Sequence, residues 1–175
     1  MSLSNKITRA LLASILFLGC VGCDQVTKGV ARAHLMLGES HSFLRDTVRL
    51  THVENTGAFL SFGEALPEDI KSTIFIVGVG LISLGALLAA LFARGLGHWQ
   101  VVSLSLIASG GIGNWIDRLT NDGRVTDFLN VGISSLRTGI FNVADMVLMA
   151  GVALYFLGSS WRASSNNSLE RMRGE

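Results

Sequence analysis

Four apolar stretches, separated by polar segments, run along the chain. A membrane-crossing helix needs about 20 mostly apolar residues, because the hydrocarbon layer is roughly 30 Å thick and a helix rises about 1.5 Å per residue. Residues 73–93 meet this requirement without a charge, and residues 99–116 and 140–158 are nearly as apolar. Residues 10–23 form a shorter stretch that follows two basic residues. The pattern predicts an all-α polytopic membrane protein with four transmembrane helices.

The first apolar stretch has a second interpretation, because a basic start, an apolar run and a cysteine also describe a secretory or lipoprotein signal. However, Phe17 lies three residues before Cys20, and Cys20 itself lies three residues before Cys23. Neither is the small residue that such cleavage sites use, so we expect a retained helix. Polar metal ligands and a βαβ context are both missing around the two cysteines, which favours buried thiols without a disulfide.

The segment between the first two stretches is not membrane-like. Residues 43–53 are rich in β-branched and apolar side chains, and their alternation slips phase near His52. This pattern predicts a small bulged β-element over about residues 40–65. Residues 55–57 are expected to form a turn. Two phenylalanines follow at the spacing of an interfacial helical anchor: Phe59 and Phe62.

Composition supports lipid as the solvent. Only 15% of the residues are charged and the mean hydropathy is +0.49, whereas a soluble domain carries roughly 25% charged residues. The net charge of +1 gives no global field that would attract nucleic acid. The 175 residues have room for one four-helix membrane domain over residues 1–161, expected to be a monomer. The Ser- and Asn-rich segment 162–175 is expected to be a disordered tail.

Basic residues do not settle the orientation in the membrane. Four spans place both termini on one side, yet eight of the 14 Lys and Arg residues would then lie on the other side. The two basic residues before the first stretch, Lys6 and Arg9, favour cytoplasmic termini, because the rule is strongest around the first helix. Composition alone leaves both orientations open.

Asp145 lies in the last apolar stretch, where a carboxylate is costly. An aspartate at the centre of a transmembrane helix costs about 2.5–3.5 kcal/mol on insertion scales, and less near the interface. We expect Asp145 one to two turns into its helix, facing protein or water, with no basic residue in the same helix to pair with it. Asn142 is three residues earlier and shares its helical face.

A second group of polar residues closes the preceding stretch. Asn114, Asp117 and Arg118 follow three glycines that would let helices approach closely. Asn114 and Asn142 could equally form hydrogen bonds between helices. Asp117 and Arg118 could either close the bundle or contact a substrate. The glycines lie within one turn of each other: Gly110, Gly111 and Gly113.

Two further carboxylates have plain structural interpretations. Asp24 and Lys28 have the i, i+4 spacing of an ion pair at a helix end. Asp127, in the segment before the last stretch, would be an ordinary loop carboxylate unless it meets Asp145 in space.

Two carboxyls held together in a low-dielectric site cannot both ionise easily, so the pair shares a proton. The charged member can then activate water while the protonated member polarises a carbonyl, which is the aspartic-protease route to amide hydrolysis. No metal or cofactor is expected, since the four histidines are scattered at positions without ligand spacing. A proton-coupled transporter or a membrane-tethered scaffold are the alternatives, but the polar residues concentrate at one end of the spans rather than through the membrane depth.

Five ordered motifs give the chain its family resemblance. It resembles the bacterial lipoprotein signal peptidases, the type II signal peptidases, from about Asp24 to Asp145. Any one motif would be a weak signal, but five in order with four spans are a strong one. The motifs are DQVTK (24–28), NTGAF (55–59), GNWIDR (113–118), VTDF (125–128) and FNVAD (141–145).

The resemblance implies a membrane aspartic endopeptidase that cuts prolipoproteins on the N-terminal side of their diacylglyceryl-modified cysteine. It implies a bacterial inner-membrane location with cytoplasmic termini, a site near the outer face, and an extracytoplasmic β-element that embraces the lipid-modified substrate. Its catalytic pair matches Asp127 and Asp145. Residues that line the substrate site match Asn55, Asn114, Arg118 and Asn142, and supporting residues match Asp24, Lys28 and Asp117.

Overall fold

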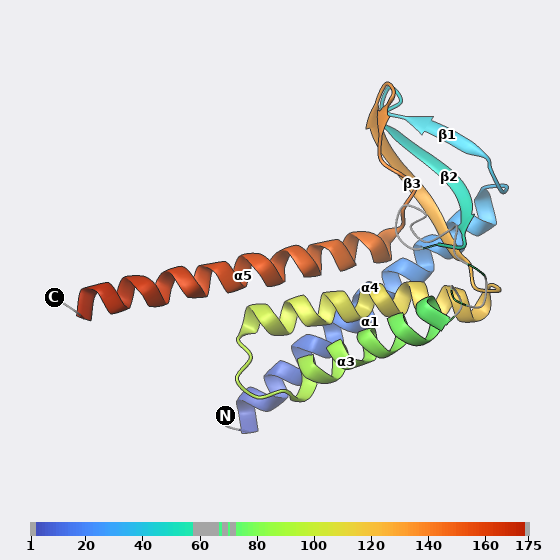
Figure 1. Cartoon of the computed structure of the whole chain (residues 1–175). Helices are drawn as coiled ribbons and strands as arrows, with labels where there is room; N and C mark the ends of the chain where they lie inside the picture. Colours follow the sequence, from blue (N-terminus) through green and yellow to red (C-terminus); the bar gives the residue numbers. More distant parts are fainter. Residues whose placement is uncertain (1–2, 58–66, 68–69, 71–72, 174–175) are drawn as a thin grey trace.

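Helices make up most of the chain, with a small sheet across one end of the bundle (Figure 1). The computed structural model describes residues 3–57, 67, 70 and 73–173, with backbone only at residues 3–4 and from residue 159 onward. The helices are α1 (Leu3–His34), the π-helical turn η2 (Thr73–Gly78), α3 (Val79–Phe92), α4 (His98–Thr120) and α5 (Val143–Arg173). The strands are β1 (Ser40–Phe43), β2 (Val48–Asn55), β3 (Val125–Ile133) and β4 (Leu136–Arg137).

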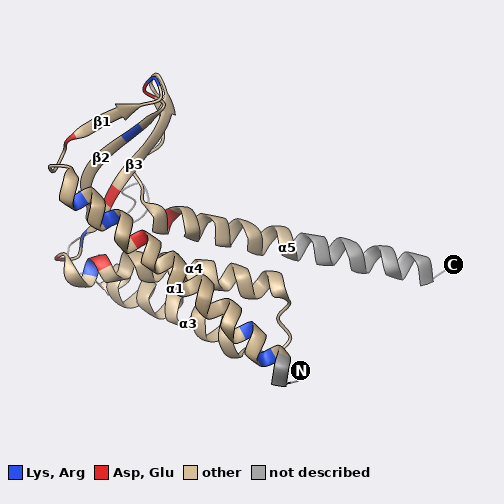
Figure 2. Ribbon diagram, turned by 180° about the vertical axis from the view of Figure 1, so that it is seen from behind, with Lys and Arg blue, Asp and Glu red and all other residues tan. Residues whose placement is uncertain are grey.

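The helices have the length and outer surface of a membrane bundle. Two stretches, Asn5–His34 and Thr73–Phe92, are long and apolar enough to cross a membrane, and Val143–Gly158 is a shorter apolar helix. Large side chains such as Leu81 and Phe156 are about two-thirds exposed on these helices. Charged residues gather towards the ends of the bundle and leave its middle uncharged (Figure 2). This distribution suits a protein whose helices are solvated by lipid.

α4 is the central helix and packs against α1, α3 and α5. A Cβ on Gly110 would lie 2.5 Å from the carbonyl oxygen of Ala144, and one on Gly113 would lie 2.7 Å from a carboxylate oxygen of Asp24. Only glycine allows α4 to approach α5 and α1 this closely. The predicted role of these glycines in helix packing is confirmed.

The sheet is antiparallel, with strand order β1-β2-β3-β4. The register of β2 against β3 shifts between Leu50 and Val53, so the predicted bulge is confirmed. The prediction of a loop at residues 125–128 is wrong, because these residues begin β3 and pair with β2. Four residues are too few to show the alternation of apolar and polar side chains that marks a strand, and the partner strand β2 lies some seventy residues earlier in the sequence.

The remaining predictions outside the site have mixed outcomes. The turn after β2 is present, since Gly57 donates its N–H to Asn55 Oδ1 at 2.8 Å. Phe59 and Phe62 lie outside the described residues. Cys20 and Cys23 are free on α1, but Cys20 is half-buried and Cys23 is exposed rather than buried. α5 continues to Arg173, whereas the composition of residues 162–175 favoured disorder.

Candidate active site

Asn142 hydrogen-bonds to both Asp127 and Asp145, the two carboxylates predicted to act as a pair. Its side-chain amide donates to Asp127 Oδ1 at 2.6 Å. Its backbone N–H donates to Asp145 Oδ2 at 3.1 Å. Both aspartates are buried, at 2% and 5% exposure, and Asn142 is fully buried between them. Asp127 is therefore no ordinary loop carboxylate, because it meets Asp145 through one shared residue.

Asp145 owes its position to the start of α5. This helix begins at Val143, so Asp145 lies in its first turn and not one to two turns in, as the apolar stretch predicted. Asn142 and Asp145 form a reciprocal cap, since the Asp145 N–H donates to Asn142 Oδ1 at 2.9 Å while the carboxylate accepts from the Asn142 N–H. The positive end of the helix dipole also favours a carboxylate there. The second oxygen, Oδ1, accepts from the amide of Asn114 at 2.8 Å.

Asp127 reaches the same point from β3. Its Oδ2 accepts a hydrogen bond from the Asn55 amide at 2.8 Å. Burial raises the pKa of Asp127 to about 7, and the charge of Asp145 adds to this effect, while the hydrogen bonds from Asn55 and Asn142 oppose it. A carboxyl with such a pKa can hold or release a proton near neutral pH.

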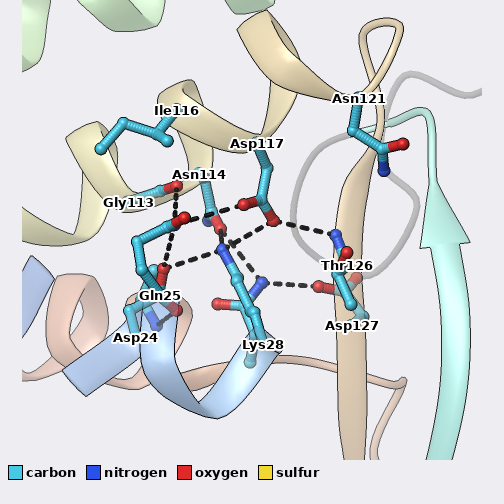
Figure 3. Close-up of polar contacts among 12 residues, drawn as sticks. Asp24, Gln25, Lys28, Gly113, Asn114, Ile116, Asp117, Asn121, Thr126 and Asp127 are labelled. Carbon is cyan, nitrogen blue, oxygen red and sulfur yellow. Dashed lines mark hydrogen bonds and ion pairs between the residues drawn. The ribbon is translucent and has the colours of Figure 1, made fainter. Parts of the chain in front are cut away.

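A buried ionic cluster lies directly behind these residues (Figure 3). Lys28 contacts Asp24 at 2.9 Å and Asp117 at 3.1 Å, and its ammonium donates to Asn114 Oδ1 at 2.9 Å. Lys28 is fully buried and each aspartate is 1% exposed. The predicted Asp24–Lys28 pair is confirmed, but it lies inside α1, which continues to His34.

The cluster ties four elements together. Asp24 of α1 accepts the N–H of Ala144 at the start of α5, at 2.8 Å. Asp117 of α4 accepts the N–H of Thr126 on β3, at 3.0 Å. The helices and the strand that carry Asp145 and Asp127 are thus held by the same three charges.

Arg118 points away from the cluster to the turn after β2. Its guanidinium donates to the Gly57 carbonyl at 2.6 Å and to the Asn114 carbonyl at 3.3 Å, and lies 5.0 Å from the ring centroid of Phe75. Asp117 and Arg118 therefore have separate partners, although they are adjacent in the chain. The Nε of Arg118 is buried without a hydrogen-bond partner among the described residues.

All nine site residues predicted from the sequence meet in this region. The structure adds two residues to the site for which the sequence predicted no role, Gln25 and Thr126. Gln25 donates to Asp24, to the Gly113 carbonyl and to Asp117, at 3.0–3.2 Å. Its place inside the first motif was the only signal for it. Thr126 likewise lies inside a motif but carries no chemistry that would single it out.

Comparisons with known proteins identify the family of the chain. The family model "Signal peptidase (SPase) II" matches residues 16–161. The lipoprotein signal peptidase of Hydrogenovibrio crunogenus is 36% identical over 160 residues, covering 90% of this chain and 88% of that protein. That of Streptococcus agalactiae serotype V is 32% identical over 161 residues, covering 91% of this chain and 98% of that protein.

A solved structure has the same fold. It is described as "Bacterial membrane enzyme structure by the in meso method at 2.3 A resolution", and it superposes with a TM-score of 0.74 and 26% identity over 90% of both chains. A second, described in the same words at 1.9 Å, gives a TM-score of 0.67 and 28% identity over 86% of this chain and 91% of that one. The chain therefore belongs to the signal peptidase II family of membrane aspartic peptidases.

Proposed function

We propose that Asp127 and Asp145 are the catalytic pair with which this peptidase removes signal peptides from prolipoproteins. The observation that carries the proposal is the bridge through Asn142, which hydrogen-bonds to both carboxylates. The substrate class follows from the curated relatives, which are lipoprotein signal peptidases. The bond that breaks is the peptide bond on the N-terminal side of the diacylglyceryl-modified cysteine.

One proton shared by the pair is enough for the reaction. The ionised carboxylate takes a proton from water as the water oxygen attacks the scissile carbonyl carbon, and the protonated carboxyl polarises the carbonyl oxygen. The C–N bond then breaks and a carboxyl gives its proton to the departing amine. The products are a signal peptide with a free carboxylate and a lipoprotein with a free N-terminal amine on its lipidated cysteine.

The surrounding side chains have separate parts in this proposal. Four polar residues line the substrate site around the pair, namely Asn55, Asn114, Arg118 and Asn142. Three of them, Asn55, Asn114 and Asn142, also fix the carboxylate oxygens through the hydrogen bonds described above. The charges of Asp24, Lys28 and Asp117 support the site from behind without touching the substrate.

In the membrane, we propose four spans formed by α1, by η2 with α3, by α4 and by α5. The bacterial inner membrane is the location that the family and the apolar helices support. Both termini would then be cytoplasmic, and the sheet and the catalytic pair would lie at the outer face. There the sheet can contact the lipid-modified part of the substrate. The protein would act as a monomer.

The experiment that tests the proposed function compares two substrates that differ only in their lipid. Purified protein in detergent is given a diacylglyceryl-modified lipobox peptide and the same peptide without the lipid, and the products are identified by mass spectrometry. We expect a single cut before the cysteine of the lipidated peptide. Absence of this cut by folded protein, or equal cleavage of the unlipidated peptide, would contradict the proposal.

The raised pKa of Asp127 predicts a loss of activity at alkaline pH. Below about pH 7 the carboxyl of Asp127 keeps a proton, and above that pH it loses the proton with which it would polarise the carbonyl. We expect kcat/KM to fall above about pH 7, approaching tenfold per pH unit. Circular dichroism over the same range checks that the fold persists, and a rate that rises between about pH 7 and pH 9 would contradict the assignment.

A further inference from the structure

The face of the β2–β3 ladder opposite to the catalytic pair carries a second polar network. Beyond the bulge, Val53 pairs with Asp127 and Glu54 pairs with Thr126. Successive side chains of a strand point to opposite faces of the sheet. Glu54 and Thr126 therefore share the face that looks away from Asp127 and towards the ends of α1 and α4.

Glu54 is the acceptor at the centre of this network. Its Oε1 accepts from the Thr126 hydroxyl at 3.0 Å, and its Oε2 accepts from the side-chain amide of Asn121, the residue that caps the C-terminus of α4. His52 Nε2 lies 2.9 Å from the same Oε1. The side chains of Glu54 and His52 are only 15% and 11% exposed, so few water molecules could replace these bonds.

The donors of the network are fixed by their other partners. Arg32 Nη1 donates to the Thr126 hydroxyl oxygen at 2.9 Å, which leaves the hydroxyl proton for Glu54. His52 Nδ1 lies 3.0 Å from the carbonyl oxygen of Leu35, just after α1, and a carbonyl can only accept. One carboxylate thus accepts hydrogen bonds from β3 and α4. It also contacts His52 of β2, which links it to the end of α1; with Nδ1 donating to Leu35, Nε2 donates to Glu54 only in the doubly protonated ring, where the contact is an ion pair.

This network holds the strand at the residue before Asp127. The Thr126 side chain is anchored to Glu54 and Arg32, and its backbone N–H is anchored to Asp117 in the ionic cluster. Thr126 is fully buried. A substitution of Glu54 would therefore shift Asp127 relative to Asn142.

We infer that Glu54 is a positioning residue for the peptidase: through His52, Asn121 and Thr126 it fixes the strand that presents Asp127 to Asn142. This inference rests on the proposed catalytic role of Asp127. The alternative is an anchor that attaches the sheet to the helices and adds stability alone. The two differ in what they predict for the chemical step.

The test compares Glu54→Gln with Glu39→Gln. Glu39 is a matched control because it belongs to a second His–Glu contact of the same sheet region, with His41 Nε2 at 2.8 Å, but that contact is exposed and far more open to water. For Glu54→Gln we expect kcat on the lipidated peptide to fall about tenfold with KM within about twofold, because geometry at the reacting groups is altered and substrate binding is not. Glu39→Gln should match the wild type.

Two further readouts separate positioning from stability. The alkaline limb of the pH profile should move to higher pH in Glu54→Gln, because the hydrogen bonds from Asn55 and Asn142 lower the pKa of Asp127 and a displaced strand weakens them. Thr126→Val should also lower kcat, and the double variant with Glu54→Gln should be no worse than the single ones, since both break one link. A loss of thermal stability alone moves neither readout.

Each outcome has one meaning. Glu54→Gln with the kcat and pH profile of the wild type overturns the inference, even if its melting temperature drops. If Glu54→Gln does not fold, Asn121→Ala and Thr126→Val decide in the same way. A wild-type protein that does not cleave the lipidated peptide would instead refute the proposed function, so the two failures are distinguishable.

Discussion

Asp127→Asn and Asp145→Asn are each expected to lower kcat for the lipidated peptide by at least about a thousandfold. The substitutions keep the shape of the side chain but remove the group that takes or gives the proton. In Asp145→Asn the amide oxygen can replace only one of the two carboxylate oxygens. The backbone N–H of residue 145 still donates to Asn142 Oδ1 at the start of α5, so the fold should persist. Because the pair acts as a unit, the double variant should be no slower than either single one.

The matched control for this series is Asp122→Asn. Asp122 is exposed in the turn after α4 with φ +47°, a conformation that Asn adopts as readily as Asp. The Asp122→Asn substitution should leave kcat unchanged. The measurement is single-turnover cleavage, with circular dichroism to show that each variant is folded. A folded Asp127→Asn or Asp145→Asn protein that retains wild-type rates would refute the assignment of the pair.

Local pattern predicted the helical part of the fold well, because helix signals lie within one stretch of chain. Apolar runs of span length became α1, α3, α4 and α5, although their ends moved by several residues. The phase slip near His52 correctly indicated the bulge, since a bulge changes which residues of one strand share a face. What the pattern could not supply was the partner strand. β3 was missed because a short strand is stabilised by pairing with a segment far away in the sequence.

The site was predicted as a set of residues but not as a geometry. The motifs named Asp127, Asp145 and Asn142, yet only the structure shows Asn142 between the two carboxylates. Asp145 was predicted one to two turns into its helix because the apolar stretch begins before the helix does. The capping arrangement at the start of α5 removes much of that cost.

Glu54 illustrates what the sequence could not indicate. It precedes a motif, has no charged neighbour in the chain, and would pass as a surface residue on a polar strand. Its partners come from β3, from the end of α4 and, through His52, from the end of α1. A network assembled from separate elements leaves no spacing pattern in the sequence, so it becomes visible only once the bulge and the β2–β3 register are known.

The second large effect is expected on stability, from Lys28→Met. This substitution keeps most of the side-chain volume but leaves Asp24 and Asp117, each 1% exposed, without their shared cation. Removing one partner of a buried ion pair costs about 3–5 kcal/mol, because the remaining charge is left uncompensated. We expect a loss of that size in the free energy of unfolding, measured in mixed micelles by denaturant titration.

Two variants show whether the loss comes from unpaired charge. Lys6→Met removes an exposed lysine near the start of the same helix and should change the free energy of unfolding by less than about 0.5 kcal/mol. The triple variant Asp24→Asn, Lys28→Met, Asp117→Asn removes all three charges and should recover part of the loss, because no bare carboxylate remains. If Lys28→Met is as stable as Lys6→Met, the ionic cluster does not hold α1, α4 and β3 together. The position of Asp127 would then have to depend on the hydrogen bonds of β2 and of Asn142 alone.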